Sequence, residues 1–217
     1  AGQVFAVRLA RFIGCTQKRN IDGDIAQLVA PALASIREII TQAHDNGTGM
    51  PLSVVREKIQ ARMSDYAGFI CHADKVRRAT RDALLLNEFV QRHGLAIKHV
   101  GEVAELFMWR HMALTSAAVL TQLTHYIDAG GGSRGARIIL DRDGNSIPQT
   151  RNGFCDAWRF RSERTEDKKD KLLIHYCNGI FHVRETPVRE FPIIRGIWFE
   201  KNWPGFLNGT IYQPQDE

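Results

Sequence analysis

Residues 101–140 have the sequence GEVAELFMWRHMALTSAAVLTQLTHYIDAGGGSRGARIIL, and a change of pattern inside this stretch decides the fold. As far as Ile127, apolar side chains recur every three to four residues, which is the period of one buried helix face. At Gly130 the helical period stops and a period of two begins. The sequence therefore predicts a long helix over residues 101–128, a short strand over residues 136–140 and a turn at Asp141–Gly144.

Three further helices are predicted upstream. The first begins after Asp24, a residue type that caps helix N-termini, and ends at Asn46–Gly47. The second begins near Pro51, whose missing N–H costs nothing in a first turn, and the third runs from about His72 to Arg92. The first of them carries an apolar stripe that we expect to face a core, made of Ile25, Leu28, Val29, Leu33, Ile36, Ile39 and Ile40. With the long helix, these segments predict a four-helix bundle.

Residues 171–184 contain a strong hairpin signal, because two alternating runs are separated by Asn178–Gly179. Both residue types accept the positive φ of a type I′ turn. The two-residue loop pairs Cys177 with Ile180 and fixes the register of the strands. One face is then apolar, with Ile174, Tyr176, Phe181 and Val183, and the other holds His175, Cys177, His182 and Arg184.

The remaining C-terminal residues give weaker signals. The charged run Glu163–Lys171 is predicted as an exposed loop, and the aromatic residues between Pro192 and Phe206 as an irregular packed segment. The fold class is therefore mainly α, with a bundle of about four helices followed by a small C-terminal segment that contains a β-hairpin, and α+β overall.

Composition excludes several classes of protein. The chain has 217 residues, of which 44% are hydrophobic and 24% charged, unlike collagen, a coiled coil or a disordered tail. No apolar run approaches the length of about 18 residues that spans a bilayer, so no transmembrane segment is expected. The four cysteines are far apart, which favours reduced thiols and a cytoplasmic protein: Cys15, Cys71, Cys155 and Cys177.

The net charge of +5 invites a nucleic-acid interpretation, but most basic residues alternate with acidic ones. The one dense basic cluster, Lys75 to Arg81, is interpreted as a solvated helix face, and no nucleic-acid partner is expected. The chain starts at Ala1 with a helical pattern already present at Val4. We therefore expect it to be a piece of a longer protein.

Two constellations of residues were weighed as sites. The segment Gly130–Gly135 satisfies GxGxxG, but a helix precedes it and a strand follows, which is the reverse of a dinucleotide-binding turn. His175, His182 and Cys177 share one hairpin face but lack a fourth ligand, so no metal site is assigned. No catalytic residue is assigned either. Arg134 stays a candidate because it is a charged residue held between glycines.

Two segments resemble the flavoprotein subunits of the succinate dehydrogenase/fumarate reductase family. Residues 54–68, VVREKIQARMSDYAG, are similar to the Arg-x-x-hydrophobic-Gln-x-x-Met segment that opens the C-terminal helical domain of that family. Ser133-Arg134-Gly135-Ala136 resembles the Ser-Arg-Gly-Ala-His motif after its last bundle helix, with Arg137 where His is usual. This departure implies a divergent branch. Residues 2–10 resemble the helix that closes the FAD-binding domain.

The resemblance implies a division of the chain and a function. Residues 1–20 would be the closing helix of an upstream flavin domain, residues 21–135 a helical bundle, and residues 136–217 a small β-containing appendage with an aromatic tail. The parent protein would be an FAD-dependent oxidoreductase that transfers hydride to or from a small organic substrate. The FAD and substrate sites lie upstream in the family, so this fragment is expected to hold no cofactor and to be inactive alone. Ser133 and Arg134 would lie near the flavin domain and brace it.

Two other classes stay open from the residues alone. The chain could be a free-standing helical protein-interaction module, which requires an exposed apolar patch. It could also bind nucleic acid through the cluster from Lys75 to Arg81, which predicts salt-dependent retention on DNA.

Overall fold

The computed structural model describes residues 2–16, 24–45, 47–146, 159–188 and 198–212. The chain divides into two compact units. One is Leu33–Val188, and the other is formed by Ala1–Ala32 together with Arg189–Glu217.

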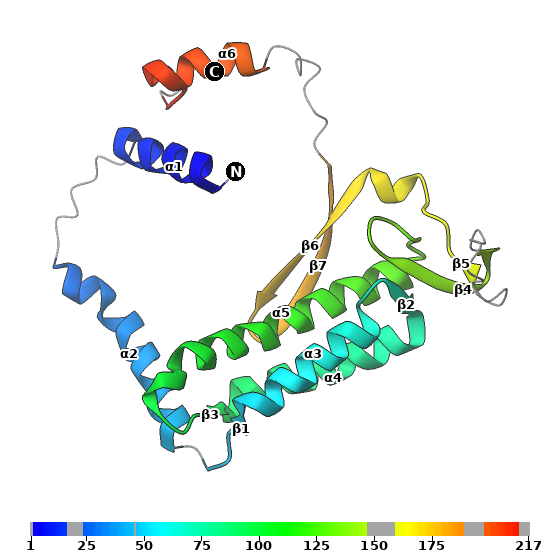
Figure 1. The fold of residues 1–217 in the computed structure, drawn as a ribbon, viewed down its shortest axis with the longest axis horizontal. Helices are drawn as coiled ribbons and strands as arrows, with labels where there is room; N and C mark the ends of the chain where they lie inside the picture. The colour runs from blue at the N-terminus through cyan, green and yellow to red at the C-terminus, as the bar shows by residue number, and fades with distance from the viewer. Residues whose placement is uncertain (1, 17–23, 46, 147–158, 189–197, 213–217) are drawn as a thin grey trace. The chain divides into compact units, whose positions relative to one another are not determined.

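Three helices form the centre of the larger unit and lie side by side in Figure 1. They are α3 (Leu52–Tyr66), α4 (Ala73–His93) and α5 (Val103–Asp128). Their facing side chains recur at helical spacing and are buried, among them Val55, Val76, Val90, Leu106 and Leu120, which are all at most 1% exposed. Removal of this apolar surface from water is the main stabilising contribution to the unit. The predicted helices over these residues are confirmed.

The pair formed by α4 and α5 also contains a buried polar link. The hydroxyl of Thr80 lies 3.1 Å from the Leu120 carbonyl oxygen and 2.7 Å from the hydroxyl of Thr124. Because the Thr80 hydroxyl is satisfied across the helix pair, its burial does not leave a polar group without a partner.

The helix α2 (Ile25–Asp45) forms as predicted, with the Asp24 carboxylate accepting a hydrogen bond from the Ala26 N–H at 2.9 Å. Only its last turns enter the core, through Ile39, Ile40 and Ala43. The rest of the stripe is exposed by 41–65% and consists of Ile25, Leu28, Val29, Leu33 and Ile36. The expectation that the whole stripe faces a core is wrong over these five residues, because periodicity identifies an apolar face without identifying what covers it. Three of them, Ile25, Leu28 and Val29, belong to the smaller unit.

Short strands join the ends of the helices. The strand β1 (Met50–Pro51) runs parallel to β3 (Leu95–Ala96), and η1 (Val100–Glu102) leads into α5. At the other end, β2 (Ile70–His72) runs parallel to β4 (Ile138–Ser146), which pairs in antiparallel fashion with β5 (Arg159–Phe160). The chain that leaves α5 is thereby tied back to the turn between α3 and α4.

The predicted turn at Asp141–Gly144 is wrong. The strand β4 continues through these residues, and its register shifts between Leu140 and Asn145, which both lie opposite Phe160. The turn signal is a local one. Residues 141–144 lie in this irregularity, between the two positions that oppose Phe160, and the Asp141 carboxylate accepts a hydrogen bond from Arg161 Nε at 2.8 Å.

The hairpin has the predicted register. The strands β6 (Asp170–Cys177) and β7 (Ile180–Pro187) pair Cys177 with Ile180 and His175 with His182. Asn178 and Gly179 have φ values of 51° and 82°, as a type I′ turn requires. The face with Tyr176 and Phe181 lies toward the bundle, and Phe181 packs against the core residues at the C-terminal half of α5.

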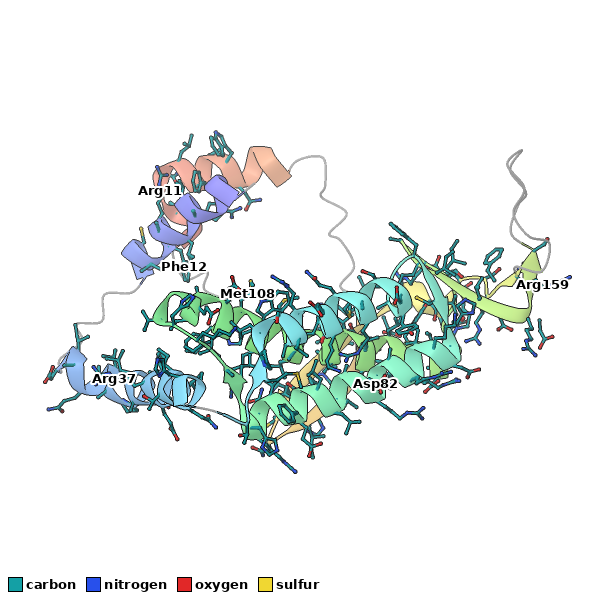
Figure 2. All side chains as sticks on the ribbon, turned by 60° about the horizontal axis from the view of Figure 1, so that its bottom comes forward. Arg11, Phe12, Arg37, Asp82, Met108 and Arg159 are labelled. Carbon is teal, nitrogen blue, oxygen red and sulfur yellow. The ribbon has the colours of Figure 1, made fainter. Side chains whose placement is uncertain are left out.

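The smaller unit contains α1 (Gly2–Thr16), α6 (Trp198–Asn208) and η4 (Thr210–Tyr212). Arg11, labelled in Figure 2, places its guanidinium carbon 4.9 Å from the centre of the Phe206 ring, a cation–π contact. Trp203 stacks on Phe206 with ring centres 5.3 Å apart. The prediction of an irregular aromatic segment is wrong over α6, because these contacts hold a helix that includes Pro204.

The cysteines of the described residues are free thiols, with Cys71 buried and Cys15 and Cys177 exposed. Cys155 lies outside the described residues.

The turn of the hairpin gives a direct test of its register. Gly179 has a φ of 82° and open space where a Cβ would stand, so a side chain there meets only backbone strain. We expect Gly179→Val to lower the free energy of unfolding by about 1–3 kcal/mol. The matched control is Gly179→Asn, because Asn accepts a positive φ and should cost much less. Equal midpoints of urea denaturation for both variants and the parent chain would contradict the assigned turn.

Candidate functional site

Several charged side chains of the larger unit lie together at the C-terminal end of α5. The helix stops at Gly130, which has a φ of 81°, and the chain then passes close to the segment after β5. A Cβ on Gly132 would overlap the carbonyl oxygen of Ser162, so only glycine allows this approach. The glycine run therefore lets two distant segments touch.

Two arginines of the approaching segment bind the end of the helix. Arg161 donates from Nη1 to the Ile127 carbonyl at 3.0 Å, and Arg164 donates from Nη1 to the Ala129 carbonyl at 2.8 Å. The last carbonyls of a helix have no partner within it and carry the negative end of the helix dipole. The two guanidinium groups donate hydrogen bonds to carbonyl oxygens at this helix end and place positive charge beside the negative end of the dipole.

Asp167 holds this arrangement together from η2 (Glu166–Lys168). It is only 7% exposed, and one carboxylate oxygen accepts the N–H groups of Gly132 at 3.2 Å and Arg164 at 3.0 Å. Its other oxygen accepts two hydrogen bonds from the Arg164 guanidinium, at 3.1 Å from Nε and 2.7 Å from Nη2. The loop predicted to be exposed over Glu163–Lys171 thus contains a buried carboxylate that accepts four hydrogen bonds, and the prediction is wrong at Asp167.

The environment of Asp167 acts on its pKa in two directions. Burial raises the pKa, but the hydrogen bonds from the Arg164 side chain and from the N–H groups of Arg164 and Gly132 outweigh it. The pKa is therefore held well below its ordinary value. Tyr126 lies next to this carboxylate and donates to the Gly132 carbonyl at 2.9 Å. Burial, followed by the charge of Asp167, raises the pKa of Tyr126 to about 12.

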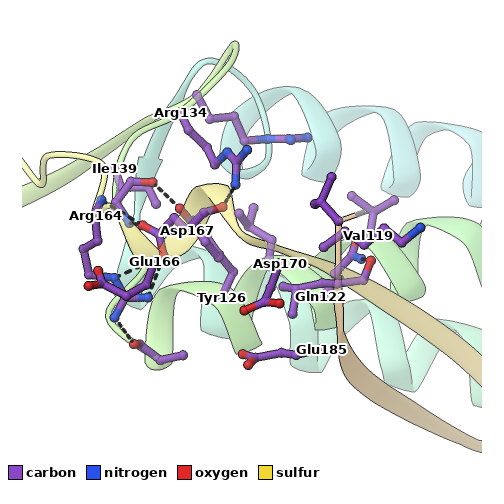
Figure 3. A pocket seen from close by; sticks show the side chains of 17 residues that line it. Val119, Gln122, Tyr126, Arg134, Ile139, Arg164, Glu166, Asp167, Asp170 and Glu185 are labelled. Atoms are coloured by element: carbon purple, nitrogen blue, oxygen red, sulfur yellow. Dashed lines mark hydrogen bonds and ion pairs between the residues drawn. The ribbon is translucent and has the colours of Figure 1, made fainter. Parts of the chain in front are cut away.

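A pocket of about 420 Å³ opens beside this network (Figure 3). It is lined by α5, by the segment after the glycine run, by η2 and by the open end of the hairpin. The lining combines apolar and charged side chains, including Val119, Leu123, Tyr126, Ile139, Leu172 and Val188 together with Arg134, Arg137, Arg164, Glu166, Asp167, Asp170, Lys171 and Glu185. Such a pocket has the size and the mixed polarity of a small-molecule site.

The two residues singled out from the sequence, Ser133 and Arg134, both lie at this end of α5. The hydroxyl of Ser133 accepts the Ile139 N–H at 2.9 Å, and its own N–H donates to the Arg161 carbonyl at 2.8 Å. Arg134 donates from Nη1 to the Asp167 carbonyl and has its Nε 3.3 Å from a Glu163 carboxylate oxygen. Ser133 is thus part of the backbone framework, and Arg134 extends from that framework with its side chain 44% exposed.

The other constellations lie elsewhere. His175, His182 and Cys177 are exposed on the outward face of the hairpin, away from the pocket lining. In the basic cluster of α4, Arg77 pairs with Asp74 at 2.9 Å and with Asp128 at 2.7 Å. These pairs neutralise part of the charge on that helix face.

Sequence reasoning missed Arg161, Arg164 and Asp167. Each stands in a run of mixed charge, and no local pattern distinguishes a charged residue that reaches a helix end from one that faces water. The only local signal was the three-glycine run itself, which indicates a close approach without identifying the approaching segment.

A comparison with protein-family models finds no match to this chain, and a comparison with curated proteins finds none either. Among the helices of the described residues, none has the length and apolar character needed to cross a membrane.

Replacement of the buried carboxylate tests the network. We expect Asp167→Asn to lower the free energy of unfolding at pH 7 by about 1–3 kcal/mol, because the two Arg164 hydrogen bonds lose their charge assistance. Asp143→Asn is the control. Asp143 is exposed, and its carboxylate accepts no hydrogen bond from an arginine within the described residues.

The effect should depend on pH with a definite sign. The folded-state pKa of Asp167 is depressed, so its ionisation stabilises the fold fully above the ordinary value of about 3.9. This contribution is lost as the pH falls through the folded-state pKa. We therefore expect the difference in the free energy of unfolding between the unmodified chain and Asp167→Asn to be smaller near pH 3 than at pH 7, as measured by urea denaturation. A difference that stays constant or widens would contradict the assignment.

Proposed function

We propose that this chain is the C-terminal part of an FAD-dependent oxidoreductase that resembles the succinate dehydrogenase/fumarate reductase flavoprotein family. In the parent protein, an upstream domain holds FAD and transfers hydride to or from a small organic substrate. This part braces that domain, because the protein's contribution to flavin chemistry is binding and orientation. The chain alone is inactive in this proposal.

The observation that carries the proposal is the order of features around Arg134. A three-helix bundle ends in α5, a glycine stop follows, and Ser133-Arg134-Gly135 then leads into β4. This is the order that the family motif implies after the last bundle helix. The segment is held rigidly by Ser133 and by the hydrogen bonds of Asp167, which suits a brace better than a mobile loop would.

The exposed stripe on α2 supports the same role. Leu28 is 65% exposed and Ile25 61%, and they stand with Val29, Leu33 and Ile36 on one helix face. A contiguous apolar face on a helix of this length is typical of a surface that another domain or protein covers. The alternative function, a free-standing helical interaction module, rests on this stripe alone.

Flavin content separates the two functions. We expect the full-length protein encoded by the gene that carries this sequence to purify with about one FAD per chain. The 217-residue chain should purify folded and colourless, because within the described residues no strand leads through a glycine turn into a helix. Absorbance spectra of both proteins, with FAD released by denaturation, measure this. A full-length protein without flavin would favour the interaction module, and stoichiometric flavin on the short chain would contradict the bracing role.

The brace itself is tested at Arg134. Its guanidinium meets the Asp167 carbonyl and the Glu163 carboxylate through different nitrogens, whereas the single ammonium of a lysine reaches only one of them. In the full-length protein we expect Arg134→Lys to weaken FAD retention several-fold, with turnover per bound FAD unchanged. Arg142→Lys, on exposed β4, is the control. Normal FAD content with turnover reduced about a thousandfold would instead make Arg134 catalytic.

A further inference from the structure

We propose that the pocket beside the end of α5 binds a small zwitterion, an aminocarboxylate whose carboxylate meets Arg137 and whose ammonium group meets Asp170 and Glu185. This proposal is independent of the flavin-bracing role. It rests on arginines at one end of the pocket and on two acidic residues at the other.

The cationic end is built by the turn after the glycine run. Arg134 and Arg137 form an isolated antiparallel bridge around Gly135, which has a φ of 58°. Residues paired across an antiparallel bridge have side chains on the same face, and both arginines line the pocket. Two guanidinium groups therefore flank the same wall.

The two arginines differ in what they are free to bind. Arg134 is committed to the Asp167 carbonyl and to the carboxylate of Glu163. Arg137 uses only Nε, which donates to the Ala67 carbonyl at 3.3 Å. Within the described residues its two terminal nitrogens have no protein partner. A guanidinium group with both terminal nitrogens available is suited to two-point binding of a carboxylate.

The acidic end lies at the open end of the hairpin. Asp170 pairs with Pro187, and Leu172 pairs with Glu185, so the two acidic residues are diagonal neighbours in the register. Both stand on the strand face that carries Ile174 farther along, the face that packs on α5. Both side chains are exposed and line the pocket, so a ligand that enters from solvent can reach them.

Figure 3 shows the carboxylates of Asp170 and Glu185 turned toward one another below Gln122. Neither side chain has a hydrogen-bond or ion-pair partner in the part of the chain that the structure describes. An ammonium group at this end of the pocket would have two carboxylates to pair with. Lys171 also lines the pocket, and no ion pair joins it to either carboxylate within the described residues.

Between the two ends the lining is apolar. Val119 and Leu123 come from α5, and Ile139 from β4 is buried at 1% exposure. Two polar side chains of this wall already have partners, since Gln122 donates to the Leu172 carbonyl at 2.7 Å and Tyr126 donates to the Gly132 carbonyl at 2.9 Å. Apolar side chains favour contact with a methylene chain, so the ligand that matches this lining is an amine and a carboxylate joined by such a chain.

A ligand series measures the requirement for both charges. Calorimetric titrations of the 217-residue chain use 4-aminobutyrate, 5-aminopentanoate and 6-aminohexanoate. For each length, the matched probes are the alkanoate, which lacks the ammonium group, and the alkylamine, which lacks the carboxylate. We expect one length to bind best, and to bind at least about tenfold more tightly than either matched probe. Equal binding of the alkanoate or of the alkylamine would overturn the proposal, as would the absence of binding across the series.

Variants then locate the site. Arg137→Gln and the pair Asp170→Asn with Glu185→Gln should each weaken binding of the best ligand by about tenfold or more. Arg142→Gln changes an arginine outside the pocket lining and should leave the affinity unchanged. Melting curves check that each variant is folded. If a variant does not fold, the ligand series on the unmodified chain still tests the proposal. Unchanged affinity in both pocket variants would overturn the assigned position.

Discussion

The anchoring of the end of α5 is the constraint on which the larger unit depends. The chain leaves α5 through three glycines, and Arg161 and Arg164 donate to the Ile127 and Ala129 carbonyls at that end from a segment more than thirty residues away. Asp167 fixes Arg164 and the Gly132 N–H together. With these hydrogen bonds formed at the end of α5, β4 pairs with β2 and the hairpin packs along α5. The pocket is lined by α5, the segment after the glycine run and the hairpin.

Local patterns predicted much of the fold and little of the site. Helical periodicity found α3, α4 and α5 because each buries one face along its whole length, and the two-residue turn at Asn178–Gly179 fixed the hairpin register because turn geometry is local. Long-range contacts were beyond such patterns. The strand β4 runs through the expected turn at Asp141–Gly144 with a shift of register opposite Phe160, and Asp167 is buried only because a distant glycine allows the approach. Ser133 was predicted only through a resemblance, whereas Arg134 was also a candidate because it stands between glycines.

The proposed role and the proposed ligand site depend on different residues at the C-terminal end of α5. Ser133 and the hydrogen bonds of Asp167 make the segment after α5 stiff, which is what a brace for a neighbouring domain requires. The exposed stripe on α2, from Ile25 to Ile36, offers the apolar area that such a neighbour would bury. The pocket, in contrast, depends on the groups that the joint leaves without partners, foremost the terminal nitrogens of Arg137.

Amide hydrogen exchange of α2 tests the central claim, that this chain braces a flavin domain. Exchange is measured for residues 25–36 in the 217-residue chain and in the proposed full-length protein, with the core residues of α4 as the internal reference. A helix face that becomes covered opens less often, so the account predicts exchange slowed by about tenfold or more in the full-length protein, with α4 unchanged. Equal exchange of residues 25–36 in the two proteins would contradict it.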